Sequence, residues 1–375
     1  MKILIDRKIP FIDGVLERYG EVVYLEGREI RREDVRNADA LIIRTRTTCD
    51  RSLLEGTKVR FIASATIGFN HIDTAFCEAN NIFWTNAAGC NSSSVLEYIA
   101  AALFHLAEEF RFELAQKTIG IVGVGNVGSK VANLCRALGM RVLLNDPPRE
   151  RREVSKEFVS LDAIIGEADI VTFHVPLNLE GADKTFHMVD EKLLAKFRKD
   201  HLLINSSRGE VVQSDALKSS LKNKLIADCV LDVWEHEPDI DRELLGLTEI
   251  ATPHIAGYSA DGKANGTAMS VQAFGRFFAL DLDEWYPEKV PLPAITTLEV
   301  ECSNLSNQAV LGSLVKRTYD ILADDARLRM SPETFEKQRG AYPLRREFPT
   351  YTLKLMNAPA GLKTLVQTIG FKTLN

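Results

Sequence analysis

The strongest constraint on the fold is a glycine-rich turn between a strand-like run and a helical pattern. Residues 118–122 are mostly apolar, residues 131–138 have helical spacing, and the turn between them reads Gly123-Val124-Gly125-Asn126-Val127-Gly128. Gly123 allows a tight turn, Gly125 lets a pyrophosphate approach the backbone, and Gly128 lets the helix pack on the strand. Because free N–H groups at the helix start attract phosphate, the turn predicts a dinucleotide-binding unit.

The next strand ends at Asp146, which stands 21 residues beyond Gly125. A carboxylate at this place accepts hydrogen bonds from ribose hydroxyls and repels a 2′-phosphate. We therefore expect NAD, rather than NADP, as the cofactor. Arg149, Arg151 and Arg152 lie nearby and weaken this preference slightly.

Short apolar runs alternate with helical patterns in two series, which predicts an α/β fold with parallel sheets covered on both faces. We expect helices over residues 11–19, 95–110 and 260–280, and the serines at 92–94 should cap the second of these. The expected strands are 2–5, 22–25, 40–43, 60–63 and 82–85 in the first series and 118–122, 141–145, 169–174, 201–205, 226–232 and 249–252 in the second.

The chain of 375 residues is too long for one ordinary core, so two or three domains are expected. A proline-rich stretch over residues 286–293 resembles a linker, and the residues after it have the pattern of a small α+β unit. Its apolar segments at 311–314 and 351–355 suggest that it cannot stand alone. We expect this unit to form a homodimer contact.

Composition argues against several other classes of protein. The formal net charge of −6 argues against nucleic acid as the main partner. No apolar stretch is long enough for a membrane span and no secretory signal is evident, so a cytoplasmic protein is expected. The six cysteines lack metal-ligand spacing, so neither a zinc site nor a disulfide framework is predicted.

Three polar islands follow strands of the second series, at residues 205–210, 232–238 and 252–258. Because carboxyl ends of parallel strands share one sheet edge, the islands should lie near the glycine turn. His254 can accept a proton near neutral pH, and Glu237 can stabilise the resulting imidazolium. Arg208 can hold a carboxylate in a bidentate fork. Each residue alone is as easily an ordinary loop residue, but together they favour oxidation of a 2-hydroxy acid.

A basic segment, Arg44-Thr45-Arg46-Thr47-Thr48, follows a strand of the first series. Two guanidinium groups and several hydroxyls suit a phosphate dianion. The alternative is a solvated strand end. The phosphate interpretation predicts a small anionic, phosphorylated 2-hydroxy acid as the substrate.

These motifs, with His174-Val175-Pro176 and the Pro253-His254-Ile255 segment, resemble the D-isomer-specific 2-hydroxyacid dehydrogenase family over roughly residues 1–285. The resemblance implies two Rossmann-like or flavodoxin-like parallel-sheet lobes. The implied domains are a discontinuous substrate lobe of residues 1–93 and 265–285, an NAD-binding domain of residues 94–264 and a C-terminal dimerisation domain of residues 286–375.

The resemblance also assigns roles to individual residues. The implied catalytic residues are Arg208, Glu237 and His254. The glycine turn contributes Gly123, Gly125, Asn126, Val127 and Gly128 to the cofactor site, with Asp146, and the resemblance adds His174, Ser206, Asp232 and Gly257. The substrate site combines Arg44, Thr45 and Arg46 with Thr66, Ile67, Gly68 and Tyr258. No metal ligand is implied.

Within the family the chain is most similar to a branch that oxidises 4-phospho-D-erythronate to 2-oxo-3-hydroxy-4-phosphobutanoate in pyridoxal 5′-phosphate biosynthesis. The similar segments are residues 1–6, 87–91, 254–263, 319–329 and 345–347. Position 45 is typically serine in that branch, and Thr45 keeps the hydroxyl. Two alternatives stay open: another substrate such as 3-phosphoglycerate or glycerate, and a binding protein that senses dinucleotides.

Overall fold

The computed structural model describes residues 1–155 and 157–374, which form two compact units. The first unit contains residues 1–91 and 259–291, and the second contains residues 92–258 and 292–375. Residues 156 and 375, which the predicted domains include, lie outside the described residues. The discontinuous first unit has the chain order expected for the substrate lobe, while the division into three functional domains stays a prediction.

The first unit is built on a parallel five-stranded sheet in the order β2-β1-β3-β4-β5. Its elements are β1 (Lys2–Asp6), η1 (Glu17–Tyr19), β2 (Glu21–Leu25), α1 (Arg32–Val35), β3 (Ala40–Ile43), α2 (Arg51–Leu54), β4 (Phe61–Ser64), α3 (Thr74–Ala79), β5 (Phe83–Asn86) and α11 (Ala260–Phe278).

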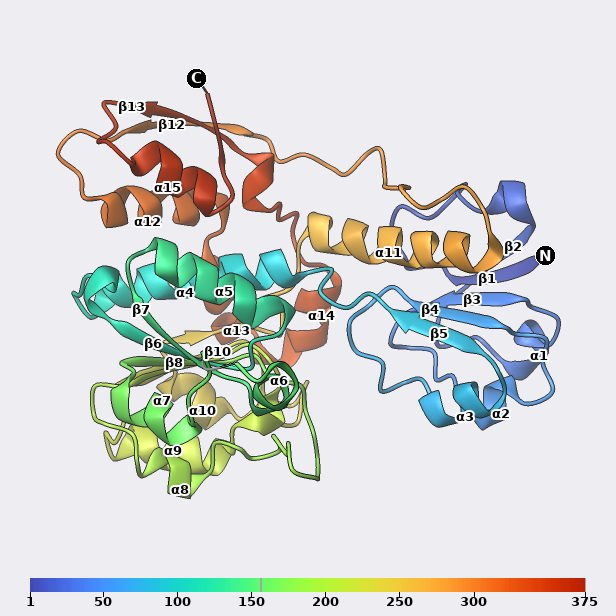
Figure 1. Cartoon of the computed structure of the whole chain (residues 1–375), viewed down its shortest axis with the longest axis horizontal. Coiled ribbons are helices and arrows are strands. Elements are labelled where there is room, and N and C mark those ends of the chain that lie inside the picture. Colours follow the sequence, from blue (N-terminus) through green and yellow to red (C-terminus); the bar gives the residue numbers. More distant parts are fainter. Residues whose placement is uncertain (156, 375) are drawn as a thin grey trace. The chain divides into compact units, whose positions relative to one another are not determined.

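Alternation along the strands explains why both faces of this sheet are covered. Successive side chains of a strand point to opposite faces. Ile3 and Ile5 of β1 pack with Phe274 of α11, whereas Leu4 joins the core that includes α2 and α3. Figure 1 shows α11 along one face and α1, α2 and α3 on the other.

The predicted helix over residues 11–19 is wrong, because only the short 3₁₀ turn η1 (Glu17–Tyr19) forms there. Phe11 and Gly14 both have positive φ, at 65° and 78°, which interrupts a right-handed helix. Ile12 and Leu16 are nevertheless buried, so the apolar spacing reflects turns packed on the sheet.

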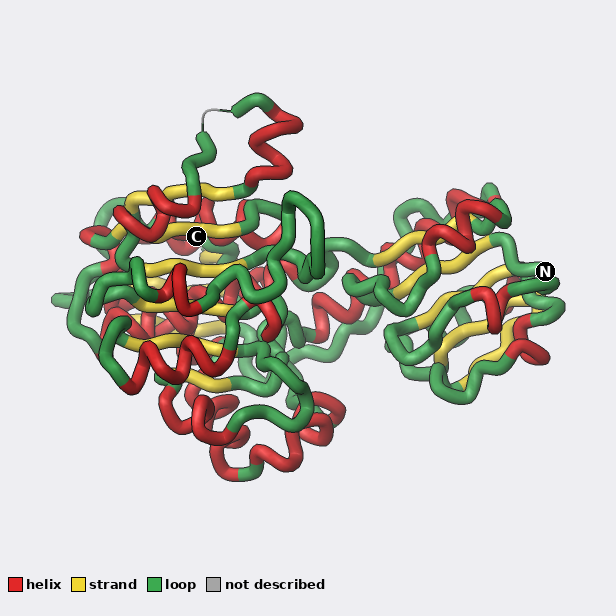
Figure 2. The backbone as a smooth tube through the Cα atoms, turned by 90° about the horizontal axis from the view of Figure 1, so that it is seen from below, coloured by secondary structure: helices red, strands yellow, loops and turns green. Residues whose placement is uncertain are grey.

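The second unit contains a parallel six-stranded sheet in the order β11-β10-β9-β8-β6-β7, and its strands lie side by side in Figure 2. Its elements before residue 259 are α4 (Ser92–Glu109), η2 (Leu114–Gln116), β6 (Thr118–Val122), α5 (Asn126–Ala137), β7 (Arg141–Asn145), α6 (Pro147–Glu153), α7 (Leu161–Glu167), β8 (Ile170–Phe173), α8 (Glu191–Leu194), β9 (Leu202–Asn205), η3 (Gly209–Val211), α9 (Ser214–Lys222), β10 (Asp228–Leu231), α10 (Arg242–Leu247) and β11 (Ile250–Ala251).

This arrangement confirms the predicted parallel sheets and places the site. Chain order reverses beside β6, where β7 lies on one side and β8 on the other. In open α/β sheets, ligands bind outside the carboxyl ends of strands at such a reversal. The glycine turn after β6 and His174 after β8 both stand there.

The prediction that the serines at 92–94 cap the helix from outside is wrong, because these serines form the first turn of α4. Ser94 is fully buried, and its hydroxyl donates to Glu347 Oε1 at 2.7 Å. Ser93 Oγ accepts a hydrogen bond from Lys130 Nζ at 2.6 Å. Tertiary partners therefore took the hydroxyls that a local pattern assigns to capping.

The C-terminal region, residues 292–374, has a parallel three-stranded sheet in the order β12-β13-β14. Its elements are β12 (Thr297–Glu301), α12 (Asn307–Thr318), α13 (Ile321–Met330), η4 (Pro332–Thr334), α14 (Phe335–Gly340), η5 (Phe348–Thr350), β13 (Thr352–Met356), α15 (Leu362–Thr368) and β14 (Lys372–Thr373).

The apolar segments at 311–314 and 351–355 were expected to need a second subunit, and that reasoning is wrong. Leu311, Leu314 and Leu353 are buried in a core that also contains residues of α4 and α5. The small unit covers these side chains within its own chain, because α12 packs directly on α4.

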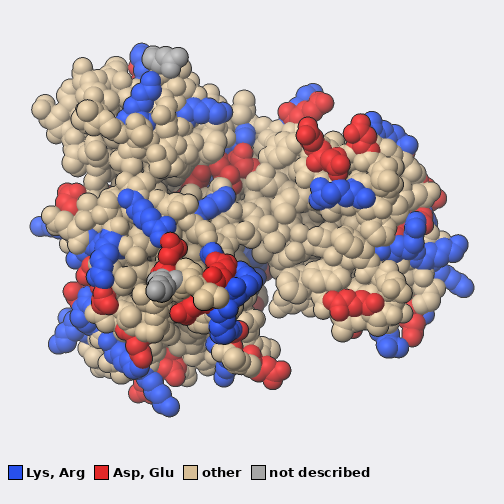
Figure 3. All heavy atoms as spheres, viewed as in Figure 1, with Lys and Arg blue, Asp and Glu red and all other residues tan. Residues whose placement is uncertain are grey.

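Three properties of the described residues bear on the class of protein. No helix among the described residues is long and apolar enough to cross a membrane. On the face that Figure 3 shows, Lys and Arg side chains lie interspersed with Asp and Glu side chains. The six cysteines are buried and form no disulfide among residues 1–155 and 157–374.

We predict that Phe274→Ala destabilises the first unit by about 3–5 kcal/mol. The Phe274 side chain is fully buried, with its ring centroid 5.8 Å from that of Phe61 and 4.7 Å from that of Phe278. Urea unfolding measures the effect. Arg276→Ala, at an exposed position of the same helix, should cost less than about 0.5 kcal/mol, and equal losses for both variants would contradict this account of the core.

Candidate active site

The glycine turn leaves space for a ligand where the motif predicts one. Gly123 has φ 89°, and a Cβ there would stand 2.7 Å from the His174 carbonyl oxygen. A Cβ on Gly128 would stand 2.0 Å from the Gly123 carbonyl oxygen, so strand and helix meet too closely for any side chain. At Gly125, by contrast, a Cβ would meet no described atom within 4 Å apart from its two neighbours in the chain. No side chain of the described residues caps α5, so its first N–H groups are available to a pyrophosphate.

Asp146 is tied to the glycine turn. Its Oδ2 accepts a hydrogen bond from the Val124 N–H at 2.8 Å, and its Oδ1 accepts one from the Arg149 N–H at 3.0 Å. These bonds fix the carboxylate beside the turn, at the place expected for contact with ribose hydroxyls.

The three nearby arginines that weakened the preference for NAD are all engaged by carboxylates. Arg149 and Arg152 pair with Glu153, and Arg151 pairs with Asp183. Hydrogen bonds from both arginines lower the pKa of Glu153 to about 2, so this carboxylate is ionised at neutral pH. A 2′-phosphate would therefore meet the Asp146 carboxylate and compete for guanidinium groups that already have partners.

His254 and Glu237 form a directly bonded pair. The His254 Nδ1 lies 2.8 Å from Glu237 Oε2, and Glu237 Oε1 accepts a bond from the Trp234 N–H at 3.0 Å. Because an ionised carboxylate can only accept, Nδ1 of His254 carries the hydrogen and Nε2 of the neutral ring keeps its lone pair. His254 has φ 56°, a left-handed conformation that is uncommon outside glycine and concentrated at functional sites.

Arg208 lines the same pocket as this pair. The pocket has a volume of about 630 Å³, and its walls come from the segments that follow β8, β9, β10 and β11. Arg208 Nη1 donates to the Ser207 carbonyl at 2.7 Å. The loop is held by buried Asn205, whose Oδ1 accepts from the Ser207 N–H at 3.1 Å and whose Nδ2 donates to the Arg208 carbonyl at 2.9 Å. The structure thus brings together the three predicted catalytic residues.

Asp232 organises the loop that carries His254. It is buried, its Oδ1 accepts from Thr252 Oγ1 and the Ile255 N–H at 2.7 Å each, and its Oδ2 accepts from the Ala256 N–H at 2.9 Å. Burial raises the pKa of Asp232, while His254 and these hydrogen bonds oppose the rise. Sequence reasoning assigned Asp232 only a contact with the cofactor. It missed that Asp232 holds the loop that carries His254, because the hydrogen-bond donors lie some twenty positions away in the chain.

Two other predicted cofactor contacts have surroundings that suit a ligand. The buried Ser206 hydroxyl lacks a hydrogen-bond partner among the described residues, which is rare for a buried polar atom. His174 Nε2 lies 3.0 Å from Thr172 Oγ1, and burial lowers the pKa of His174 to about 3. His174 therefore presents a neutral ring next to the glycine turn. Gly257 follows in the loop held by Asp232.

A second histidine–carboxylate pair lines the pocket, and sequence reasoning missed it. His187 Nε2 lies 2.6 Å from Glu235 Oε1, and Glu235 Oε2 accepts from the Ser214 N–H at 2.7 Å. The hydrogen bonds and His187 outweigh burial and lower the pKa of Glu235. No group of three or more His, Cys, Asp or Glu side chains in the described chain is placed to hold a metal ion.

The predicted substrate residues of the first unit follow two paired strands, β3 and β4. Arg44 Nη1 donates to the Lys8 carbonyl at 2.9 Å, while Thr45 and Arg46 are exposed.

At the end of β4, Thr66 Oγ1 lies 2.8 Å from Ser64 Oγ and donates to the Gly68 carbonyl at 3.4 Å. The carbonyl of Ile67 accepts from Asn86 Nδ2 at 2.6 Å. Partial burial and the charge of Arg44 lower the pKa of Lys263, which adds a third cation to this end of the unit.

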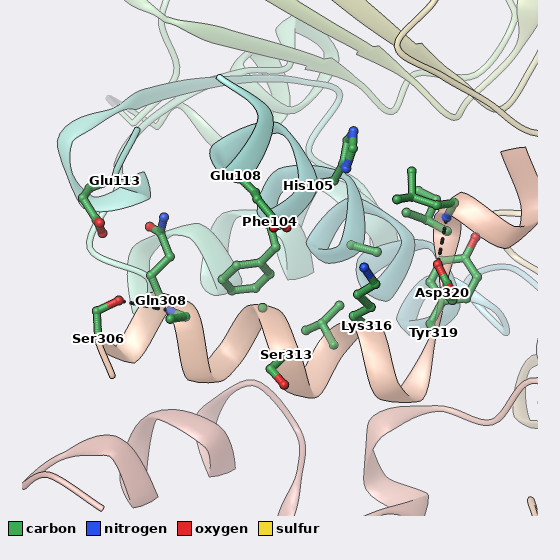
Figure 4. A pocket seen from close by; sticks show the side chains of 16 residues that line it. Phe104, His105, Glu108, Glu113, Ser306, Gln308, Ser313, Lys316, Tyr319 and Asp320 are labelled. Carbon is green, nitrogen blue, oxygen red and sulfur yellow. Dashed lines mark hydrogen bonds between the residues drawn. The ribbon is translucent and has the colours of Figure 1, made fainter. Parts of the chain in front are cut away.

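Another pocket of the second unit, about 490 Å³ in volume, lies between α4 and α12 (Figure 4). Phe104 and His105 of α4 face Lys316 of α12 across it, with Tyr319 and Asp320 at one end. None of the predicted catalytic, cofactor or substrate residues lines this pocket. It marks the seam between the C-terminal region and the rest of the unit.

Comparison with known proteins gives the family. Residues 100–256 match the model of the D-isomer specific 2-hydroxyacid dehydrogenase NAD-binding domain, and residues 291–370 match a domain of unknown function. An erythronate-4-phosphate dehydrogenase of Bacteroides fragilis is 51% identical over 354 residues, with 94% of this chain and 99% of that protein covered. One of Proteus mirabilis is 41% identical, with 99% of each chain covered. The chain belongs to the erythronate-4-phosphate dehydrogenase family.

Solved structures agree on the fold. Aquifex aeolicus D-lactate dehydrogenase, complexed with NAD and lactic acid, has a TM-score of 0.58 at 23% identity, with 76% of this chain and 97% of that chain covered. A Staphylococcus aureus formate dehydrogenase in complex with NAD has a TM-score of 0.60 at 23% identity, with 74% and 96% covered. The predicted dehydrogenase family, enzyme class and NAD cofactor are thus confirmed for this erythronate-4-phosphate dehydrogenase family member.

We predict that Asp146→Asn weakens NAD binding about tenfold and narrows the preference over NADP, because the ribose hydroxyls lose a charged acceptor. Isothermal titration with each dinucleotide measures both effects. The control is Glu150→Gln, which removes one exposed carboxylate from α6 and should leave both affinities unchanged. Unaltered NAD binding in the Asp146 variant would contradict the assigned role.

Proposed function

We propose that this protein oxidises 4-phospho-D-erythronate to 2-oxo-3-hydroxy-4-phosphobutanoate with NAD, as a step of pyridoxal 5′-phosphate biosynthesis. One observation carries the proposal: Arg208, Glu237 and His254 line one pocket, with His254 Nδ1 and Glu237 Oε2 at 2.8 Å. The full-length similarity to erythronate-4-phosphate dehydrogenases supports the choice of substrate.

The residues of the pocket divide the chemical work. Nε2 of His254 takes the proton of the C2 hydroxyl, and the Glu237 carboxylate stabilises the imidazolium that forms. Arg208 holds the C1 carboxylate and stabilises charge on the developing carbonyl oxygen. NAD, when bound, supplies the hydride acceptor. Gly123, Gly125, Asn126, Val127, Gly128 and Asp146 would hold its dinucleotide, and His174, Ser206, Asp232 and Gly257 would lie on its nicotinamide side.

The proposal also assigns substrate contacts to residues of the first unit. Arg44 and Arg46 offer guanidinium groups to the phosphate, and Thr45 and Thr66 offer hydroxyls. Ile67 and Gly68 contribute backbone groups at the end of the neighbouring strand. Tyr258 is also assigned a contact with the substrate.

We predict that His254→Asn lowers kcat at least about 1,000-fold while NAD affinity and melting temperature stay unchanged, because asparagine can neither take the proton in oxidation nor donate it in reduction near neutral pH. The assay runs in the reductive direction with 2-oxo-3-hydroxy-4-phosphobutanoate and NADH, since oxidation of the hydroxy acid is uphill. No turnover by the wild-type protein would refute the substrate. Comparison of kcat/KM with the oxo acids of glycerate and 3-phosphoglycerate tests the other candidates.

The same variant separates an enzyme from a dinucleotide sensor. Wild-type protein should restore growth of a bacterial strain that needs added pyridoxine because it lacks this activity, and His254→Asn should not. Full rescue by His254→Asn would refute an enzymatic role in that pathway.

We further propose that the protein is a cytoplasmic homodimer. Exposed apolar side chains of the C-terminal region support the dimer, among them Leu292, Ile295 and Leu344. Light scattering at micromolar concentration should give twice the 41.8 kDa mass of one chain. A mass of one chain at that concentration would refute the dimer.

A further inference from the structure

The C-terminal region is an addition to a common dehydrogenase fold. Solved structures of that fold match this chain over 96–99% of their own length. The same matches leave about a quarter of this chain without a counterpart. A separate family model, of unknown function, matches residues 291–370. Contacts within the second unit indicate what this addition does.

The C-terminal region is bonded directly to the catalytic loop after β11. The buried Arg345 stacks on Tyr319, with its guanidinium carbon 3.7 Å from the centre of the ring. Its Nη1 donates a hydrogen bond to the Ala256 carbonyl at 3.2 Å. Asp325 Oδ1 accepts from the Ala251 N–H at 2.7 Å. Both ends of the segment that bears His254 are thus held by α13 and the chain after α14.

One cation of the C-terminal region lies against the predicted substrate residue Tyr258. The guanidinium carbon of Arg339, on α14, is 5.8 Å from the centre of the Tyr258 ring. The Tyr342 ring packs edge-on against Tyr258, with centroids 5.7 Å apart and planes at 89°. These two neighbours fix Tyr258 four residues beyond His254.

The hydrogen bonds of Arg339 are incomplete. Nη1 donates to Glu336 Oε1 at 2.6 Å, but the buried Nε has no partner among the described residues. The plain alternative is a surface pair between residues three apart on one helix. That alternative leaves the unsatisfied Nε unexplained, because a surface guanidinium would expose it to water and a structural one would bond it.

The charge of Arg339 reaches the catalytic pair. Burial alone would lower the pKa of Arg339. The nearby Tyr258, Glu336 and Glu237 outweigh burial and raise this pKa above its ordinary value, so the guanidinium is charged near neutral pH. Arg339 does not line the pocket of Arg208 and His254. Arg339 is therefore not one of the groups that face Arg208 and His254 in that pocket.

We propose that the C-terminal region completes the substrate site by supplying Arg339, which binds the phosphate of the substrate beside Tyr258. A planar guanidinium offers parallel N–H groups to phosphate oxygens, and Nε is one of the two donors such a pair uses. This role rests on the proposed dehydrogenase function for its substrate. It assigns the unknown domain a direct part in specificity.

The test compares a phosphorylated and an unphosphorylated oxo acid. We expect Arg339→Gln to lower kcat/KM for 2-oxo-3-hydroxy-4-phosphobutanoate about 10- to 100-fold, mostly through KM. For 2-oxo-3,4-dihydroxybutanoate, which lacks the phosphate, we expect less than about a threefold change. Arg339→Lys, which keeps the charge and loses the fork, should fall between wild type and Arg339→Gln.

Lys337→Gln is the matched control, since it removes one exposed positive charge from the same helix and should change neither value. Equal losses on both oxo acids would show a merely structural Arg339, and unchanged KM for the phosphorylated acid would show no contact. Either result overturns the proposal.

A binding measurement keeps this inference separate from the proposed function. Inorganic phosphate should bind NAD-loaded wild-type protein and Lys337→Gln alike, and about tenfold more weakly to Arg339→Gln. If wild-type protein fails to reduce the oxo acid but this difference is found, the substrate assignment falls and the phosphate site stands. If turnover is normal and phosphate binding does not depend on Arg339, the substrate assignment stands and the phosphate site at Arg339 falls.

Discussion

The buried carboxylate of Asp232 is the constraint on which the site depends. It accepts hydrogen bonds from the hydroxyl of Thr252 and from two backbone N–H groups, those of Ile255 and Ala256. A buried charge is costly unless several donors satisfy it, so the loop cannot move away without leaving Asp232 unpaired. The left-handed backbone of His254 is held inside this clamp, and the ring thereby meets Glu237.

The same loop is supported from the other side by residues of the C-terminal region. Arg345 bonds the carbonyl of Ala256, whose N–H is bonded by Asp232, so one peptide segment is held from two directions. Tyr98 of α4 adds a bond between its hydroxyl and Thr252 Oγ1, at 2.9 Å. Dehydrogenase chemistry needs an imidazole placed to within a fraction of an ångström, and three separate elements of the second unit restrict its position.

Charge is arranged differently at the two ends of the second unit's candidate site. Around Asp146, the arginines are paired with Glu153 and Asp183, so these carboxylates occupy the cations that would otherwise favour a 2′-phosphate. Near His254, Arg208 donates to a backbone carbonyl, and Arg339 keeps an Nε that no described residue satisfies. The guanidinium groups near His254 therefore have donors that are not all used by carboxylates.

The sequence by itself determined the parallel sheets, the glycine turn and the polar islands at strand ends, because side-chain period, glycine spacing and strand-end position are local properties. It also indicated Arg208, Glu237 and His254 as a set, although their meeting in one pocket depended on the strand order. Only the tertiary structure decided that residues 11–19 form turns, that Leu311 and Leu353 are buried within the chain, and that Ser94 bonds Glu347 rather than capping α4. It alone placed Glu235 on His187 and Arg339 on Tyr258. Such contacts join residues far apart in the chain, so packing selects the partners and the local sequence carries no signal for them.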